Sequence, residues 1–130
     1  MTTLATRKTL AAALVAAAVA APAGAAFAHH AFSMYDNTKY TKVTGEVKGY
    51  SWSNPHTMVD FVVMTADGKT ESWTAECSPI NMLRTRGWTS GSLKVGDKAE
   101  FVIHPNKENA HYGLLVSATL PDGSTFKDKD

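Results

Sequence analysis

The sequence predicts a mostly β domain that combines five short strands with one short helix after the third strand. Two observations support this fold class. Apolar residues alternate with polar residues over several short segments, and turn-forming residues such as Gly, Pro, Asn and Asp separate those segments. The chain has 130 residues, of which 44% are hydrophobic and 19% charged, and this length and composition suit a single domain.

The first predicted strand covers residues 41–50, and a turn at residues 52–55 ends it. Gly45 and Gly49 fall in its inward-facing set, where they would let a long strand bend sharply. In a small barrel, a strand that is shared between the two sides must bend in this way.

Four further strands are predicted at residues 57–65, 70–77, 98–104 and 113–120. Ala66-Asp67-Gly68 is a strong hairpin signal between the second and third strands. Ser78 as N-cap, Pro79 at the first helical position and Gly87 as the stop predict one short helix between them.

Three strands, a helix and two strands follow one another in the order of an OB-fold barrel. A five-stranded antiparallel sandwich or open roll fits the same pattern. We expect the barrel domain to cover residues 41–126, with an irregular N-terminal arm at 29–40 and a frayed tail at 127–130.

A cleavable export signal is predicted in residues 1–28. Arg7 and Lys8 give a basic start, residues 10–21 form an uncharged apolar run, and Ala26-Phe27-Ala28 is a typical cleavage sequence. The run is too short to span a bilayer, which takes about 20 apolar residues. We therefore expect a mature chain that begins at His29, lies in the periplasm or outside the cell and has no integral membrane segment.

The mature chain is nearly neutral. Removing Arg7 and Lys8 from the 13 basic residues leaves 11 against 12 acidic residues, which argues against nucleic-acid binding. The single cysteine, Cys77, cannot form a disulfide within the chain. Its inward position on the third strand favours an inert small hydrophobe over a thiol activated by the following helix.

All five histidines follow the predicted signal, at His29, His30, His56, His104 and His111. In an OB barrel, the loops after the first and fourth strands form the usual binding surface. The last three histidines lie in or beside these two loops, so we expect them to converge at one pole. Because imidazole is the commonest metal ligand in proteins, this placement predicts a metal site.

The remaining two histidines add a copper-specific feature. Cleavage after Ala28 would make His29 the terminal residue, whose α-amine and ring nitrogen together can chelate Cu(II) with one further imidazole. This start resembles the His brace of several exported copper proteins, and the His30 ring offers an alternative arrangement. An arm of 12 residues extends up to roughly 40 Å, so it can reach the barrel pole.

Other ligands and roles stay open. Zinc is an alternative metal, although the chain has no H-E-x-x-H or CxxC spacing. Four methionines could add thioether ligands for Cu(I): Met34, Met58, Met64 and Met82. The structural alternative is that His56 caps a turn beside Asn54-Pro55 and that His104 ends a strand before Pro105.

Catalysis has little support. The chain has no nucleophile elbow, no diagnostic acid and base pair and no Gly-rich phosphate loop. Tyr50 and Trp52 are expected on the outer face of the first strand, where they could dock on another envelope protein. Alternatively, Phe32 and Tyr35 of the arm cover them.

Several motifs resemble a family of small exported bacterial proteins that carry a domain of unknown function. They are His29-His30-Ala31-Phe32, Gly45-Glu46-Val47, Trp52-Ser53-Asn54-Pro55-His56, Ser78-Pro79 with Asn81-Met82-Leu83, Arg86-Gly87-Trp88, and Leu93-Lys94-Val95-Gly96-Asp97. The resemblance implies an exported, single-domain, mostly β protein with no established activity. We therefore predict a non-enzymatic binding protein for copper or a similar divalent metal, with a docking module for an envelope protein as the alternative.

Overall fold

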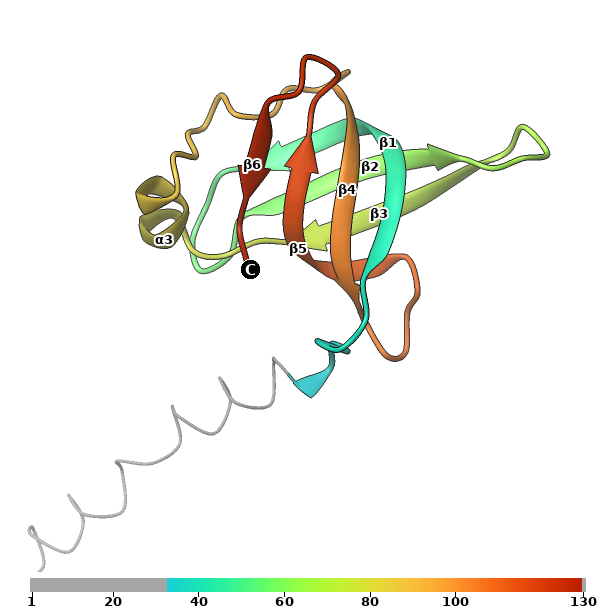
Figure 1. Cartoon of the computed structure of the whole chain (residues 1–130), viewed down its shortest axis with the longest axis horizontal. Coiled ribbons are helices and arrows are strands. Elements are labelled where there is room, and N and C mark those ends of the chain that lie inside the picture. The colour runs from blue at the N-terminus through green and yellow to red at the C-terminus, as the bar shows by residue number, and fades with distance from the viewer. Residues whose placement is uncertain (1–32, 130) are drawn as a thin grey trace, which may run out of the picture. The chain divides into compact units, whose positions relative to one another are not determined.

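The computed structural model describes residues 33–129 (Figure 1). The predicted signal, together with His29 and His30, lies outside the described residues. The elements are β1 (Thr41–Ser51), β2 (Met58–Met64), β3 (Thr70–Glu76), α3 (Ile80–Thr85), β4 (Lys98–Pro105), β5 (Tyr112–Thr119) and β6 (Thr125–Lys127).

The strands close into a mixed barrel, which confirms the predicted fold class and excludes the open roll and the sandwich. The strand order is β3-β2-β1-β4-β5-β6, and a parallel pairing of β3 with β5 completes the ring. This is the topology of an OB fold. Figure 1 shows the β2–β3 hairpin projecting from one side of the barrel and α3 lying beside the other.

The long strand β1 is shared between the two sides of the barrel, as predicted. Its first half pairs with β4 and its second half pairs with β2. Gly45 lies where these halves meet, and a Cβ there would stand 2.6 Å from Phe61 Cδ2 and 2.8 Å from the Val62 carbonyl oxygen. Only glycine allows this close approach between β1 and β2.

The core fills the barrel with apolar side chains from every strand of the ring. Phe61 of β2 and Phe101 of β4 stack at its centre, with ring centroids 4.0 Å apart. Cys77 is fully buried in this core, and burial raises the pKa of its thiol well above the ordinary value. The prediction of an inert, hydrophobic Cys77 is therefore supported.

A β-bulge in β1 overturns the predicted position of Tyr50. The register of β1 against β2 shifts between Val47 and Gly49, so that Tyr50 pairs with the fully buried Val59. A bulge inserts one residue and moves the following side chains to the opposite face. Tyr50 is consequently half-buried against the core, and its hydroxyl donates to the carbonyl oxygen of Thr89 at 3.0 Å.

The helix begins differently from the prediction. Pro79 is the N-cap and makes no side-chain capping bond, whereas Asn54 Oδ1 accepts the Ile80 backbone N–H at 3.1 Å. Ser78, predicted as the N-cap, instead donates its backbone N–H to Asp128. The helix stops as predicted, since Gly87 has a φ of +84°.

Residues 127–129, which the sequence analysis expects to fray, are held in place. Lys127 ends β6, and Asp128 is fully buried. Asp128 accepts the Ser78 backbone N–H at 2.7 Å and an N–H of Arg86 at 2.8 Å. The indole N–H of Trp88 donates to the Lys127 carbonyl oxygen at 2.8 Å. These partners lie 39 to 50 residues away in the chain, which explains why the local composition of the tail was misleading.

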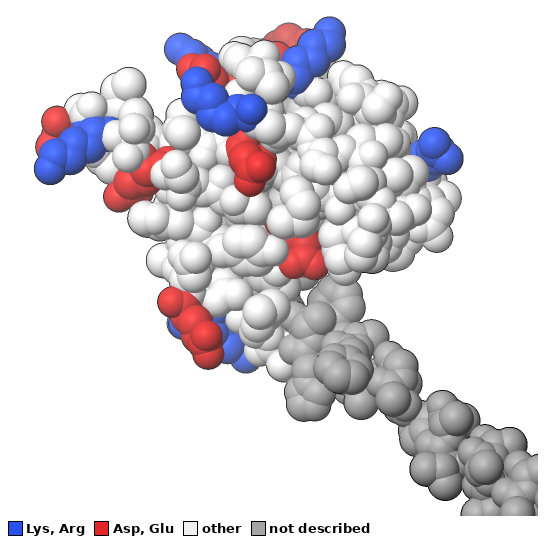
Figure 2. Space-filling view, turned by 180° about the vertical axis from the view of Figure 1, so that it is seen from behind, with Lys and Arg blue, Asp and Glu red and all other residues white. Residues whose placement is uncertain are grey.

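The charged side chains are mixed in sign. On the face shown in Figure 2, basic and acidic groups lie next to one another rather than in one basic field, and Lys42 and Lys48 pair with Glu100 and Glu46. Among the described residues, no helix has both the length and the apolar character needed to cross a membrane.

Candidate functional site

The candidate site lies on the outer surface of the barrel, where β3 ends. Strand register aligns Met58 of β2, Glu76 of β3, Leu114 of β5 and His104 of β4 in one row. Residues directly opposite one another on paired strands share a face of the sheet. This face is the outer one, because the alternate positions of these strands belong to the core.

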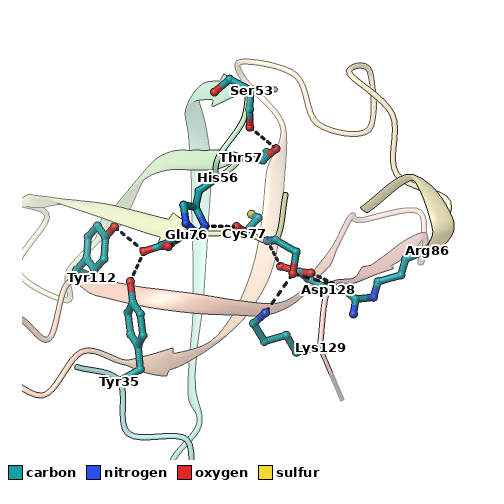
Figure 3. A network of polar contacts seen from close by, with 11 residues as sticks. Tyr35, Ser53, His56, Thr57, Glu76, Cys77, Arg86, Tyr112, Asp128 and Lys129 are labelled. Carbon is teal, nitrogen blue, oxygen red and sulfur yellow. Dashed lines mark hydrogen bonds and ion pairs between the residues drawn. The ribbon is translucent and has the colours of Figure 1, made fainter. Parts of the chain in front are cut away.

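His56 is attached to Glu76 through one ring nitrogen. Its Nδ1 lies 3.0 Å from Glu76 Oε1 and 3.4 Å from the Cys77 carbonyl oxygen (Figure 3). Both partners accept hydrogen bonds, so Nδ1 carries a hydrogen, and in the neutral imidazole the Nε2 lone pair is left for another partner. Within residues 33–129, Nε2 has no hydrogen-bond or ion-pair partner, and the side chain is 37% exposed.

Two tyrosines bind the other oxygen of the same carboxylate. The hydroxyl groups of Tyr35 and Tyr112 both donate to Glu76 Oε2, the latter at 3.1 Å. Their rings stack with centroids 6.1 Å apart. Burial and the Glu76 carboxylate raise the pKa of Tyr35 far above its ordinary value, and burial raises that of Tyr112. Both phenols are therefore neutral donors at physiological pH.

Tyr35 belongs to a segment that runs along the end of β4. It forms an isolated bridge with Asn106, and the Asp36 backbone N–H donates to the Pro105 carbonyl oxygen at 2.9 Å. The prediction that Tyr35 covers Tyr50 and Trp52 is wrong, because its ring lies against Tyr112. Phe32, its predicted companion, lies outside the described residues.

The other two described histidines have different partners. His104 is only 5% exposed; its Nδ1 donates to the Lys39 carbonyl oxygen at 2.8 Å, and its ring contacts Tyr40. His111 Nε2 lies 3.5 Å from Glu71 Oε2, and its ring contacts Trp73 in the first half of β3.

The described histidines consequently do not assemble a metal site by themselves. Residues 33–129 contain no group of three or more His, Cys, Asp or Glu side chains placed to hold one ion. His56 lies at the end of β3 beside Glu76, whereas His111 lies near its start. The other two predicted ligands, His29 and His30, lie outside the described residues.

Sequence reasoning missed Glu76, Tyr35 and Tyr112 as members of this site. Glu76 alternates with the core residues of β3 and therefore lies on the outer face of this strand. Its contacts with the tyrosines depend on the parallel register of β3 and β5 and on the path of residues 34–40. The OB topology predicts that β3 and β5 are parallel neighbours, but it does not give the residues that pair. It says nothing about the path of residues 34–40.

A family model describes most of this chain. It matches residues 15–116 and is described as a family of unknown function, DUF6152. The chain belongs to the DUF6152 family. The DUF6152 match contains every member of the network around Glu76 and ends before β6 and Asp128. No curated protein and no solved structure matches the chain.

Proposed function

We propose that this DUF6152 protein is a non-enzymatic, exported binding protein that holds a copper ion at His56. The N-terminal residues His29 and His30 supply the remaining nitrogen ligands once the signal is removed. Carriage or sequestration of the ion is its role. The observation that carries the proposal is the fixed Nδ1 of His56, held by the Glu76 carboxylate and the Cys77 carbonyl oxygen.

That arrangement is typical of a metal-binding histidine. A ligating imidazole usually donates its second ring N–H to a carboxylate or a backbone carbonyl, which orients the ring and raises the basicity of the ligating nitrogen. Glu76 is in turn held by two phenols, so the carboxylate that orients His56 is itself fixed. The partly exposed ring lets an ion enter and leave.

The attachment of Tyr35 supports a contribution from the N-terminus. Tyr35 donates to the same carboxylate that orients His56. His29 precedes Tyr35 by six positions, and an extended chain of that length spans at most about 20 Å. This short separation along the chain favours His29 as a source of further ligands for copper bound to His56.

His104 and His111 are the weaker members of the predicted ligand set. His104 is buried with its Nδ1 bound to a carbonyl oxygen, and His111 pairs with Glu71. Under this proposal, both have structural roles. The alternative of a docking module that uses Tyr50 and Trp52 loses support, because both side chains are partly buried against the core.

The test is a Cu(II) titration of untagged protein that begins at His29, followed by electron paramagnetic resonance. We expect one copper with nitrogen ligands, lost when one extra residue precedes His29. His56→Ala weakens binding at least about tenfold, because it removes a ligand. His111→Ala is the matched control and binds copper like the wild type.

Two results would overturn the proposal. The first is equal copper binding by the wild type, His56→Ala and the extended chain, which would indicate adventitious sites. The second is an affinity that does not fall as the pH is lowered from about 7 to 5, since protons compete for ligating imidazoles. Tight Zn(II) binding without Cu(II) binding would replace copper with zinc at the same residues.

A further inference from the structure

We propose that His56 and Met58 together form a binding site for Cu(I), so that the protein holds copper in its reduced state. This inference rests on the proposed role of His56 in copper binding. It differs from the proposed Cu(II) site in the oxidation state of the ion and in the addition of a sulfur ligand. It also requires neither the α-amine of His29 nor signal cleavage.

The geometry follows from the alternation of side chains at the start of β2. Thr57 and Val59 are fully buried, so Met58 points outward, and His56 precedes Thr57 on the same outward side. His56 and Met58 therefore flank one buried residue and share a face. A His-x-Met pair at the start of a strand places an imidazole and a thioether next to each other.

Glu76 connects the two side chains from the neighbouring strand. It is the register partner of Met58, and directly opposite residues have Cβ atoms about 5 Å apart. It also contacts Nδ1 of His56 at 3.0 Å, so His56 and Met58 both lie beside the same carboxylate. Because Nδ1 is occupied, Nε2 is the nitrogen that would bind together with the Met58 sulfur.

The chemistry of this pair favours Cu(I). A thioether is a soft ligand that selects Cu(I), and imidazole suits copper in either oxidation state. Glu76 is 15% exposed and adds a nearby carboxylate that favours a bound cation. Met58 is only partly buried, so an incoming ion can reach its sulfur.

Met64 provides a natural comparison within the same strand. It lies on the same outward-facing set of β2 but opposite Thr70, and it is 73% exposed. It has a thioether without a neighbouring imidazole or carboxylate from its register partner. If exposure alone decided where Cu(I) binds, Met64 would be the better ligand. Because an imidazole and a carboxylate lie beside Met58, we expect Met58 to be the ligand instead.

The experiment measures Cu(I) affinity without oxygen, by competition with a chromogenic Cu(I) chelator, in the mature protein and in Met58→Leu and Met64→Leu. We expect Met58→Leu to weaken Cu(I) binding at least about tenfold and Met64→Leu to leave it unchanged. X-ray absorption of the Cu(I) protein should show one sulfur and at least one nitrogen ligand, and the sulfur should disappear in Met58→Leu.

The two proposals fail in different ways. Wild-type Cu(I) affinity in Met58→Leu, or no sulfur ligand in the wild-type spectrum, overturns the His-x-Met site even if the Cu(II) chelate at His29 is found. Loss of the Cu(II) chelate with retained Cu(I) binding in the N-terminally extended chain supports both sites. Cu(I) binding by a mature protein that forms no Cu(II) chelate supports the His-x-Met site and rejects the terminal chelate. The wild-type spectrum decides the question even if Met58→Leu fails to fold.

Discussion

Two carboxylates, Glu76 and Asp128, form the centres of two polar networks on either side of Cys77 (Figure 3). Asp128 is fully buried and is bound by a guanidinium and a backbone N–H. Glu76 is partly exposed and is bound by two neutral phenols and an imidazole. The two networks involve neighbouring residues of the chain. Glu76 faces outward, Cys77 points into the core, and the backbone N–H of Ser78 donates to Asp128.

The Asp128 network has the features of a structural clamp, and the Glu76 network has those of a candidate binding site. At Asp128, a full positive charge offsets the carboxylate, and the pair ties the C-terminal tail to the segment around α3. At Glu76, the two phenol donors are neutral, and the imidazole keeps one nitrogen that no described residue binds. The buried Asp128 carboxylate paired with a cation stabilises the fold. The partly exposed Glu76 carboxylate holds an imidazole whose second nitrogen can still bind a ligand.

The largest expected effect is on stability and comes from Asp128→Ala. The substitution leaves the Arg86 guanidinium and the Ser78 backbone N–H without their buried acceptor. We expect the free energy of unfolding to fall by about 3 kcal/mol, measured by urea denaturation. Arg84→Ala, on the exposed side of α3, is the control and should change it by less than about 0.5 kcal/mol.

The same variant tests the separation of the two networks. Copper binding should survive in Asp128→Ala wherever the protein is folded, because within residues 33–129 no hydrogen bond or ion pair joins the side chains of Glu76, His56, Tyr35 and Tyr112 to Asp128. A parallel loss of copper affinity and stability would show that the two networks form one unit, and the comparison would then fail.

The second effect concerns affinity and comes from Glu76→Gln. The amide keeps the size of the side chain but removes the negative charge that accepts from His56 and the two tyrosines. We expect copper affinity to fall about tenfold and the free energy of unfolding to fall by about 1 kcal/mol. Both are measured on the same preparation by metal titration and urea denaturation.

Glu71→Gln is the matched control for this substitution. Glu71 lies beside His111, as Glu76 lies beside His56, but on the first half of β3. It should leave copper affinity unchanged. Equal losses in both variants would mean that the carboxylates act only through the overall charge of the protein.

The third effect is on the alkaline limit of stability. The pKa of Tyr35 is raised in the folded state, so the folded chain keeps a proton that the unfolded chain releases above about pH 10. Its contribution to stability is therefore complete below pH 10 and is lost as the pH rises further. Tyr35→Phe should reduce the dependence of the unfolding free energy on pH above 10 by about one proton.

The measurement is urea denaturation at a series of pH values from about 8 to 11. Tyr40→Phe is the control, because the Tyr40 ring is largely exposed and lies against His104 rather than against a carboxylate. An unchanged slope in Tyr35→Phe would show that the tyrosine does not hold its proton against the Glu76 carboxylate.

The fold was predictable from local patterns because apolar and polar residues alternate over several residues in most strands of the barrel. The alternation failed at two bulges. One lies between β4 and β5, where Val102 and Ile103 face Ser117 and Leu115, so that Leu115 and Ala118 both reach the core. The other lies between Val47 and Gly49, where an added residue reverses the faces and turns Tyr50 inward. Nothing in the local pattern marks that position, since Gly49 fits either face. The barrel and its helix were therefore predicted correctly, whereas the position of the aromatic pair was not.

The candidate site was predictable only in part, for a related reason. The loop after β1 predicted His56 as a candidate ligand, but the contacts of Glu76 with His56 and with Tyr112 depend on strand register. The Asp128 clamp was missed because a short polar tail has no apolar pattern, and its order depends on Arg86 and Trp88. Local sequence patterns cannot predict contacts between residues that lie far apart in the chain and belong to no common alternating pattern.

The smallest expected effect is that of Lys129→Ala, which tests whether the clamp depends on charge or on burial. Lys129 Nζ donates to Ser78 Oγ at 3.1 Å, beside the Arg86 contact with the same oxygen. Its partner is a hydroxyl that also accepts from Arg86, so we expect a loss of less than about 0.5 kcal/mol by urea denaturation. Arg86→Ala, in contrast, removes the cation that pairs with the buried Asp128 and should destabilise the fold several times more. Equal losses of unfolding free energy in Lys129→Ala and Arg86→Ala would mean that the total positive charge around Asp128 matters more than its ion pair with Arg86.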